Sequence, residues 1–265
     1  MTRAFATGLR VHLVHLLRSP FDLVAILIWP VIFASIAYYL IGTDGSTRVL
    51  FVASLGAAMM MLWSQVIVGS GFSLDQQRNQ GTLELLVAAP VPLVIVIAPV
   101  MIASAAFGIY GLLVTLAWGR FAFGIPIAIA HPVAFVVAAV AAIVSIGLLG
   151  LIAASLFVLS RAASYFGVAL QYPVYLASGL MLPLALLPAW IDPVSWVLAP
   201  TWGYRALTHA SGGGGAWRDI GMCVLLSVVY LVLALPCLAW FERVARARGT
   251  QKLSRTGCAS SSTAG

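Results

Sequence analysis

Six long apolar stretches, separated by short polar breaks, account for most of this 265-residue chain. Spanning a hydrocarbon core of about 30 Å takes roughly 20 apolar residues in a helix, because a helix satisfies its own backbone hydrogen bonds in lipid. The stretches lack the alternation of period two that marks barrel strands. The sequence therefore predicts an all-α, polytopic membrane protein with six transmembrane helices, at residues 21–41, 49–74, 93–118, 132–159, 163–182 and 220–241.

Composition excludes a water-soluble domain. Hydrophobic residues are 62% of the chain and charged residues only 8%, whereas an average soluble chain carries roughly a quarter charged residues. A soluble surface of this size cannot be covered by so few charges, so the expected solvent is lipid.

The basic residues predict the orientation. With six spans both termini share one side, and ten of the fourteen Lys and Arg residues fall on that side. The opposite side holds Arg48, Arg120, Arg205 and Arg218. By the positive-inside rule both termini are cytoplasmic, in a cell (plasma) membrane protein. The net charge of +7 then fits membrane lipids as a partner. We expect no nucleic acid, because the arginines are not interleaved with aromatic platforms.

Three segments flank or interrupt the predicted six-span domain at residues 21–241. The leader at 1–20 has the pattern of an amphipathic helix on the cytoplasmic face. The stretch at 183–217 between the fifth and sixth spans is apolar and holds half of the tryptophans, which suits an external re-entrant or interfacial segment. The tail at 242–265 is basic and then rich in Ser, Thr and Gly from residue 249, which predicts disorder.

The sequence contains no recognisable arrangement of catalytic residues. Lys252 is the single lysine and follows no glycine-rich turn, so the chain has no Gly-x-x-x-x-Gly-Lys-Ser/Thr phosphate cradle. The four histidines lack metal-site spacing. All seven carboxylates fall at or beyond span ends, which disfavours an ion-coupled transporter. We expect no catalytic residue, no metal and no cofactor on this chain, with energy supplied from outside it.

The break between the second and third spans, at residues 75–92, is the candidate point of energy entry. Gly81 can end one helix and Thr82 can cap the next, whose first turn holds Leu83 and Glu84. Pro90 stops that helix. The pattern predicts a capped cytoplasmic helix, and a well-capped loop without further function is the equally simple interpretation.

A substrate path needs polar or adaptable side chains within the spans. The second and fifth spans offer Met60, Ser64, Gln65, Gln171, Tyr172, Tyr175 and Ser178. Methionines adapt to varied cargo shapes, but interhelical packing and hydrogen bonding are the commoner use of such residues. Both interpretations stay open, and the cargo is not identified.

Two groups of motifs resemble the type 2 permease family of ATP-binding-cassette exporters, of the daunorubicin-resistance type. The first is Gly81-Thr82-Leu83-Glu84-Leu85-Leu86 followed by Pro90-Val91-Pro92. The second comprises Gly179-Leu-Met-Leu-Pro183, Leu187-Pro188-Ala-Trp190 and Pro200-Thr201. Their order, with six spans and an amphipathic leader, makes the resemblance extend over nearly the whole chain.

The resemblance implies a permease half that pairs with a second permease subunit, most simply as a homodimer, and with cytosolic ATPase subunits that bind ATP and Mg. It implies that the break between spans two and three docks on the ATPase through Asp75, Arg78, Gly81, Thr82, Leu83 and Glu84. It also implies an external gate that includes Pro183, Pro188, Trp190 and Pro200. The chain departs from the family where Gln76, Gln77, Asn79 and Gln80 replace a more charged run.

We interpret the chain as a permease subunit that is not itself an enzyme. It is expected to move a hydrophobic or amphipathic substrate outward, such as a drug, a lipid or a glycan-linked molecule. The alternatives are a membrane scaffold or assembly protein that moves nothing, and a self-contained secondary transporter or channel.

Overall fold

The structure is a computed structural model that describes residues 20–41, 47–79, 93–127, 129–159, 163–181 and 187–261. Within these ranges the chain is helical and contains no strand, which confirms the all-α prediction. The elements are α2 (Pro20–Ile41), α3 (Thr47–Asn79), α5 (Leu93–Phe123), α6 (Pro132–Leu159), α7 (Ala163–Ala177), η2 (Ala189–Ile191), α8 (Asp192–Val197), α9 (Ala199–Gly212) and α10 (Ala216–Ser261). The predicted leader lies, except for Pro20, outside the described residues.

Each predicted span has a helix at its place, but α7 is shorter than expected. It ends at Ala177, five residues before the predicted end at residue 182. Gly179 there has a φ of 72°, and its N–H donates to the carbonyl of Leu176 at 3.1 Å. The N–H of Leu180 donates to the carbonyl of Tyr175 at 3.2 Å. These two bonds around a left-handed glycine form a Schellman closure, which satisfies the last carbonyls of α7.

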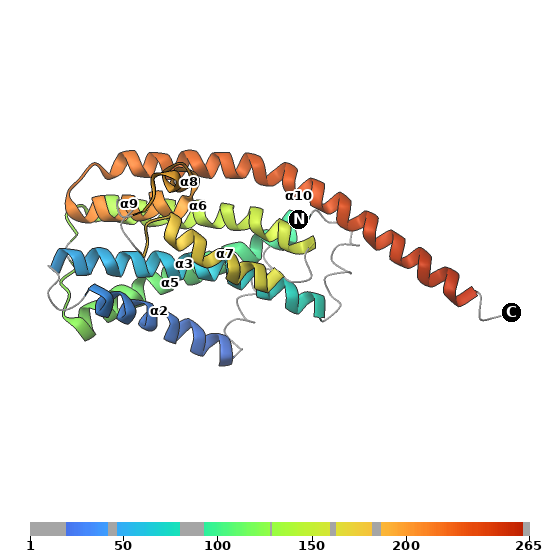
Figure 1. Cartoon of the computed structure of the whole chain (residues 1–265), viewed down its shortest axis with the longest axis horizontal. Coiled ribbons are helices and arrows are strands. Elements are labelled where there is room, and N and C mark those ends of the chain that lie inside the picture. Colours follow the sequence, from blue (N-terminus) through green and yellow to red (C-terminus); the bar gives the residue numbers. More distant parts are fainter. Residues whose placement is uncertain are drawn as a thin grey trace.

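The last helix, α10, is longer than expected. It continues to Ser261, through most of the tail for which composition predicted disorder. The sequence Ala245-Arg-Ala-Arg248 favours continuation past the sixth predicted span, because Ala and Arg are among the strongest helix formers, and nothing in the composition from residue 249 onward explains the remaining turns. Figure 1 shows this part of α10 projecting beyond the other helices.

The long helices lie side by side, and their connections gather at two ends (Figure 1). The end of α2, the starts of α3 and α6, and the link between α9 and α10 lie at one end, which we call the hairpin end. The C-terminus and the start of α7 lie at the other, which we call the tail end. Two backbone bonds join connections at the hairpin end: Ala130 donates to the carbonyl of Ser211 at 3.1 Å, and His131 to that of Ala210 at 3.2 Å. The last carbonyls of α9 are thereby satisfied.

Helix α3 is the centre of the core, in contact with α2, α5, α6, α7 and α9. Leu55, Met59 and Trp63 are each at most 1% exposed. Glycines allow close approach of the neighbouring helices: a Cβ on Gly108 of α5 would lie 2.8 Å from Leu62 Cγ, and one on Gly203 of α9 would lie 2.7 Å from Ala142 Cβ. Small residues at contacts are how helices pack in lipid, where no hydrophobic force drives them together.

Three helices have segments that are long and apolar enough to cross a membrane, among the residues whose side chains are described. These segments are Arg48–Ile67, Pro132–Ala153 and Ala216–Cys237. They fall in α3, α6 and α10, which are the second, fourth and sixth predicted spans.

The end of α7 is held against α3 at Gly56, which yields a stability prediction. A Cβ at position 56 would lie 2.9 Å from the carbonyl oxygen of Leu180, and backbone cannot give way as a flexible side chain can. We expect Gly56→Ala to lower the free energy of unfolding by about 1–3 kcal/mol, measured by thermal unfolding in detergent.

Gly221→Ala is the matched control for that substitution, because Gly221 is also helical but has no atom within 4 Å of an added Cβ. It should unfold at or slightly above the temperature of the unmodified chain, since alanine is the better helix former. Equal unfolding temperatures for Gly56→Ala and the unmodified chain would contradict the close approach at Gly56.

Candidate functional site

The structure brings together the polar residues that the sequence singled out in the second and fifth spans. The hydroxyl of Ser64 in α3 donates to Oε1 of Gln171 in α7 at 3.2 Å. The hydroxyl of Tyr175 in α7 donates to the backbone carbonyl of Met60 at 2.8 Å. Gln171, Val174, Tyr175 and Ser178 are all buried, and their spacing places them on one face of α7. That face and the facing side of α3 form what we call the α3–α7 seam.

The seven predicted path residues do not all face the same way. Tyr175 is 0% and Gln171 8% exposed, whereas Tyr172 is 59% exposed, with its ring edge-on to that of Tyr175 at a centroid distance of 6.2 Å. Met60, Ser64 and Gln65 are partly buried, and Gln65 makes only a weak contact with the sulfur of Met61 at 4.0 Å. The Ser178 hydroxyl is buried without a partner among the described residues. Within one chain, the seam side chains therefore serve as interhelical contacts.

The predicted coupling residues lie at or beyond the end of α3. Asp75 and Arg78 belong to its last turns, at the tail end of the bundle. Their side chains are outside the described residues, and so are Gly81, Thr82, Leu83 and Glu84 entirely. The capped helix expected there stays a prediction.

The predicted external residues that the structure describes differ in burial. Pro183 lies outside the described residues. Pro188 directly precedes η2 and is exposed, and Trp190 within η2 is 71% exposed. Pro200 is buried in the first turn of α9, a position where its missing N–H costs no hydrogen bond.

Side chains from two other helices fix the short helix α8. The indole N–H of Trp202 in α9 donates to the carbonyl of Trp196 at 2.8 Å, and the hydroxyl of Tyr230 in α10 donates to the carbonyl of Val197. A six-residue helix leaves its last carbonyls without helical partners, so these bonds satisfy groups that lipid cannot. Trp190 and Trp196 remain more than half exposed, as in the aromatic belt of a membrane interface.

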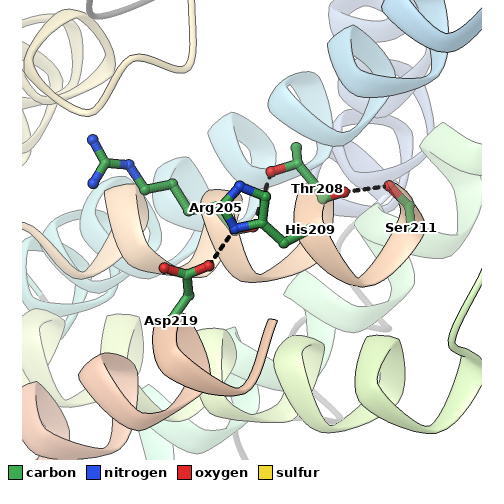
Figure 2. A network of polar contacts seen from close by, with 5 residues as sticks. All are labelled: Arg205, Thr208, His209, Ser211 and Asp219. Atoms are coloured by element: carbon green, nitrogen blue, oxygen red, sulfur yellow. Dashed lines mark hydrogen bonds and ion pairs between the residues drawn. The ribbon is translucent and has the colours of Figure 1, made fainter. Parts of the chain in front are cut away.

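One polar pair was missed by the sequence reasoning, which treated its members as separate span-end residues. Nδ1 of His209 in α9 lies 2.5 Å from Oδ2 of Asp219 in α10 (Figure 2). Asp219 is 5% exposed. The available signal was the run of glycines from Gly212 to Gly215, because so short and flexible a link brings the end of one helix against the start of the next. Arg205, one turn before His209, lies over the Trp202 ring at 5.2 Å.

No group of three or more His, Cys, Asp or Glu residues that could hold a metal ion occurs among the side chains that the structure describes. Besides the α3–α7 seam, the bonds to α8 and the His209–Asp219 pair, the described residues include the interhelical bonds from Trp118 to Ser35 and from Tyr204 to the carbonyl of Val52. They are hydrogen-bonding arrangements, suited to holding helices in register.

The seam yields a second stability prediction. Tyr175→Phe removes the hydroxyl that bonds to the Met60 carbonyl and leaves that acceptor without this donor. We expect a loss of about 1 kcal/mol in the free energy of unfolding, the usual size of such a bond within a membrane. Tyr172→Phe removes the same atom from the exposed face of the same helix and should leave the unfolding temperature unchanged. Both variants are to be compared in detergent with the unmodified chain, and equal effects would show that the seam bond contributes nothing particular.

Comparison with known families gives one match. The family model described as "ABC-2 type transporter" matches residues 4–210, most of the chain, from the leader into α9. No match was found among curated proteins.

Proposed function

The chain belongs to the ABC-2 type transporter family and is a transmembrane permease subunit, and from this premise we propose that it exports a hydrophobic or amphipathic substrate with ATP hydrolysed by a separate cytosolic subunit. The family match over residues 4–210 carries the proposal. The sequence adds that the chain has no phosphate cradle of its own. ATP and Mg accordingly belong to the partner.

The proposed topology has six passes, with the hairpin end outside the cell and the tail end in the cytoplasm. Successive long helices alternate in direction between the two ends in Figure 1, which supports this count. The α3–α5 connection, the C-terminus and most of the basic residues then share the cytoplasmic side of the plasma membrane, as the positive-inside rule requires.

The proposed external segment starts from the short helix α7. Its 15 residues reach about 22 Å, less than the roughly 30 Å of a hydrocarbon core. The chain then continues through η2 and α8 into α9, whose residues Trp202, Ala206 and Ala210 are buried. We assign η2, α8 and α9 to a re-entrant segment in the outer leaflet, with Pro183, Pro188, Trp190 and Pro200 in its gate.

The assembly proposed is a homodimer of this chain with two ATPase subunits. One chain holds one coupling segment, and a closed assembly with two ATPase sites needs two such segments. The exposed side of α7, with Tyr165 at 78% and Tyr172 at 59% exposed, is where a second copy or the substrate would be met. In a path between the two copies, Tyr172 would contact the substrate directly, and the residues of the α3–α7 seam would lie behind it.

Coupling is proposed to pass through residues 75–92, which begin in the last turns of α3. A force on that segment reaches the centre of the bundle, because α3 contacts α2, α5, α6, α7 and α9. Asp75, Arg78 and Glu84 would supply the charged contacts to the ATPase, and Gly81, Thr82 and Leu83 the shape of the docking helix.

Variants of that segment test the proposal. Glu84→Ala removes a first-turn carboxylate whose interaction with the helix dipole is worth about 0.3–1 kcal/mol, too little to unfold the bundle. We expect normal membrane insertion, with transport and substrate-stimulated ATP hydrolysis falling together in the complex with the ATPase. Gly81→Val should be more severe, because a β-branched residue resists a left-handed turn.

Asp44→Ala is the matched control, because it removes a carboxylate from the opposite side of the proposed topology. It should transport at the unmodified rate. If Glu84→Ala and Gly81→Val reach the membrane and also transport at that rate, the segment is only a well-capped loop and the proposed coupling is wrong.

A further inference from the structure

We propose that His209 and Asp219 are positioning residues that hold α9 in register with α10 and thereby place the external segment η2–α8 for transport. The inference rests on the proposed external gate and assigns two residues outside the family motifs to it.

The contact has the geometry of a fixed pair. His209 Nδ1 and Asp219 Oδ2 are 2.5 Å apart, and the Asp219 side chain is 8% exposed against 53% for His209. Asp219 also lies in the first turn of α10, where the helix dipole favours a carboxylate. Among the described residues no lysine or arginine forms an ion pair with Asp219. Separating a buried carboxylate from its one side-chain partner costs free energy, because the buried charge is then left uncompensated.

The link between the two helices adds to this fixation. Gly213 has a φ of 78°, and the N–H of Gly214 donates to the His209 carbonyl at 3.0 Å. A Cβ on Gly214 would lie 3.5 Å from atoms of the His209 ring. The imidazole therefore lies beside the glycine link, and the backbone of the same residue is bonded to that link.

At the other end of the α9–α10 pair, a side chain from each of the two helices bonds to α8. Trp202 lies seven residues, or two turns, before His209 on the same face of α9. Its indole bonds to the carbonyl of Trp196, while Tyr230 of α10 bonds to the next carbonyl, that of Val197. Two successive carbonyls of α8 are thus bonded to different helices. A shift of α9 along α10 would break one of these bonds, so the register that His209 and Asp219 set also determines where α8 and Trp190 lie.

The first test compares variants at position 209 in proteoliposomes that contain the complex with the ATPase. Asn carries its amide nitrogen at the position of Nδ1, two bonds from Cβ, so His209→Asn can keep the contact, whereas His209→Ala loses it. We expect transport per ATP hydrolysed to fall about fivefold in His209→Ala and in Asp219→Ala, the factor that corresponds to the net contribution of one ordinary hydrogen bond. It should stay near the unmodified value in His209→Asn, and the double alanine variant should be no worse than either single variant.

His131→Ala is the matched control, since His131 is an exposed histidine at the same end whose backbone N–H, not its ring, makes the contact with α9. A fall of transport and ATP hydrolysis in equal proportion, with transport per ATP unchanged, would overturn the positioning role. This outcome differs from failure of the proposed function, in which the unmodified complex itself shows no ATP-driven transport.

A second test needs no ATPase. Trp190→Cys introduces an exposed thiol into η2, and a membrane-impermeant maleimide reports its accessibility from outside the cell, with the chain lacking this cysteine as the blank. We expect the labelling rate to change about fivefold when His209→Ala or Asp219→Ala is added, and to be unchanged with His209→Asn. Equal rates in all four backgrounds would overturn the inference whatever the transport assay shows.

Discussion

The requirement that backbone hydrogen bonds be satisfied within the protein shapes this structure more than any other constraint. Long helices meet it by themselves. The ends of α7, α8 and α9 do not, and there the chain uses special closures: the Schellman bonds at Gly179, the Trp202 and Tyr230 bonds to α8, and the Ala130 and His131 bonds to the end of α9. An irregular segment closed in this way can remain next to lipid, which makes it available for function.

Sequence reasoning placed the long helices well, because continuous apolar runs report the thickness of a membrane. It placed the end of α7 too late, since hydropathy continues past Ala177 and only Gly179 signals the turn. It missed the His209–Asp219 pair for a different reason. Ten residues and a change of helix separate the two side chains, and no periodicity within one helix predicts a contact across a turn.

The sequence identified polar residues in the second and fifth spans but did not decide whether they line a substrate path or join the helices. The sequence named Ser64, Gln171 and Tyr175, and the structure adds that Ser64 bonds to Gln171 and Tyr175 to the carbonyl of Met60. These bonds join α7 to α3, whereas Tyr172 faces the surroundings. Since α3 continues to Asn79, a movement of its last turns would be carried along the helix to the α3–α7 seam.

The central claim is that energy enters this permease from a separate subunit. The most direct measurement compares proteoliposomes containing the purified chain alone with those containing the chain and its ATPase, for ATP hydrolysis and for ATP-driven movement of a fluorescent amphipathic probe. The account predicts neither activity from the chain alone and both from the complex, abolished together when ATP is omitted. ATP hydrolysis by the pure chain, or movement of the probe without the ATPase subunit, would contradict it.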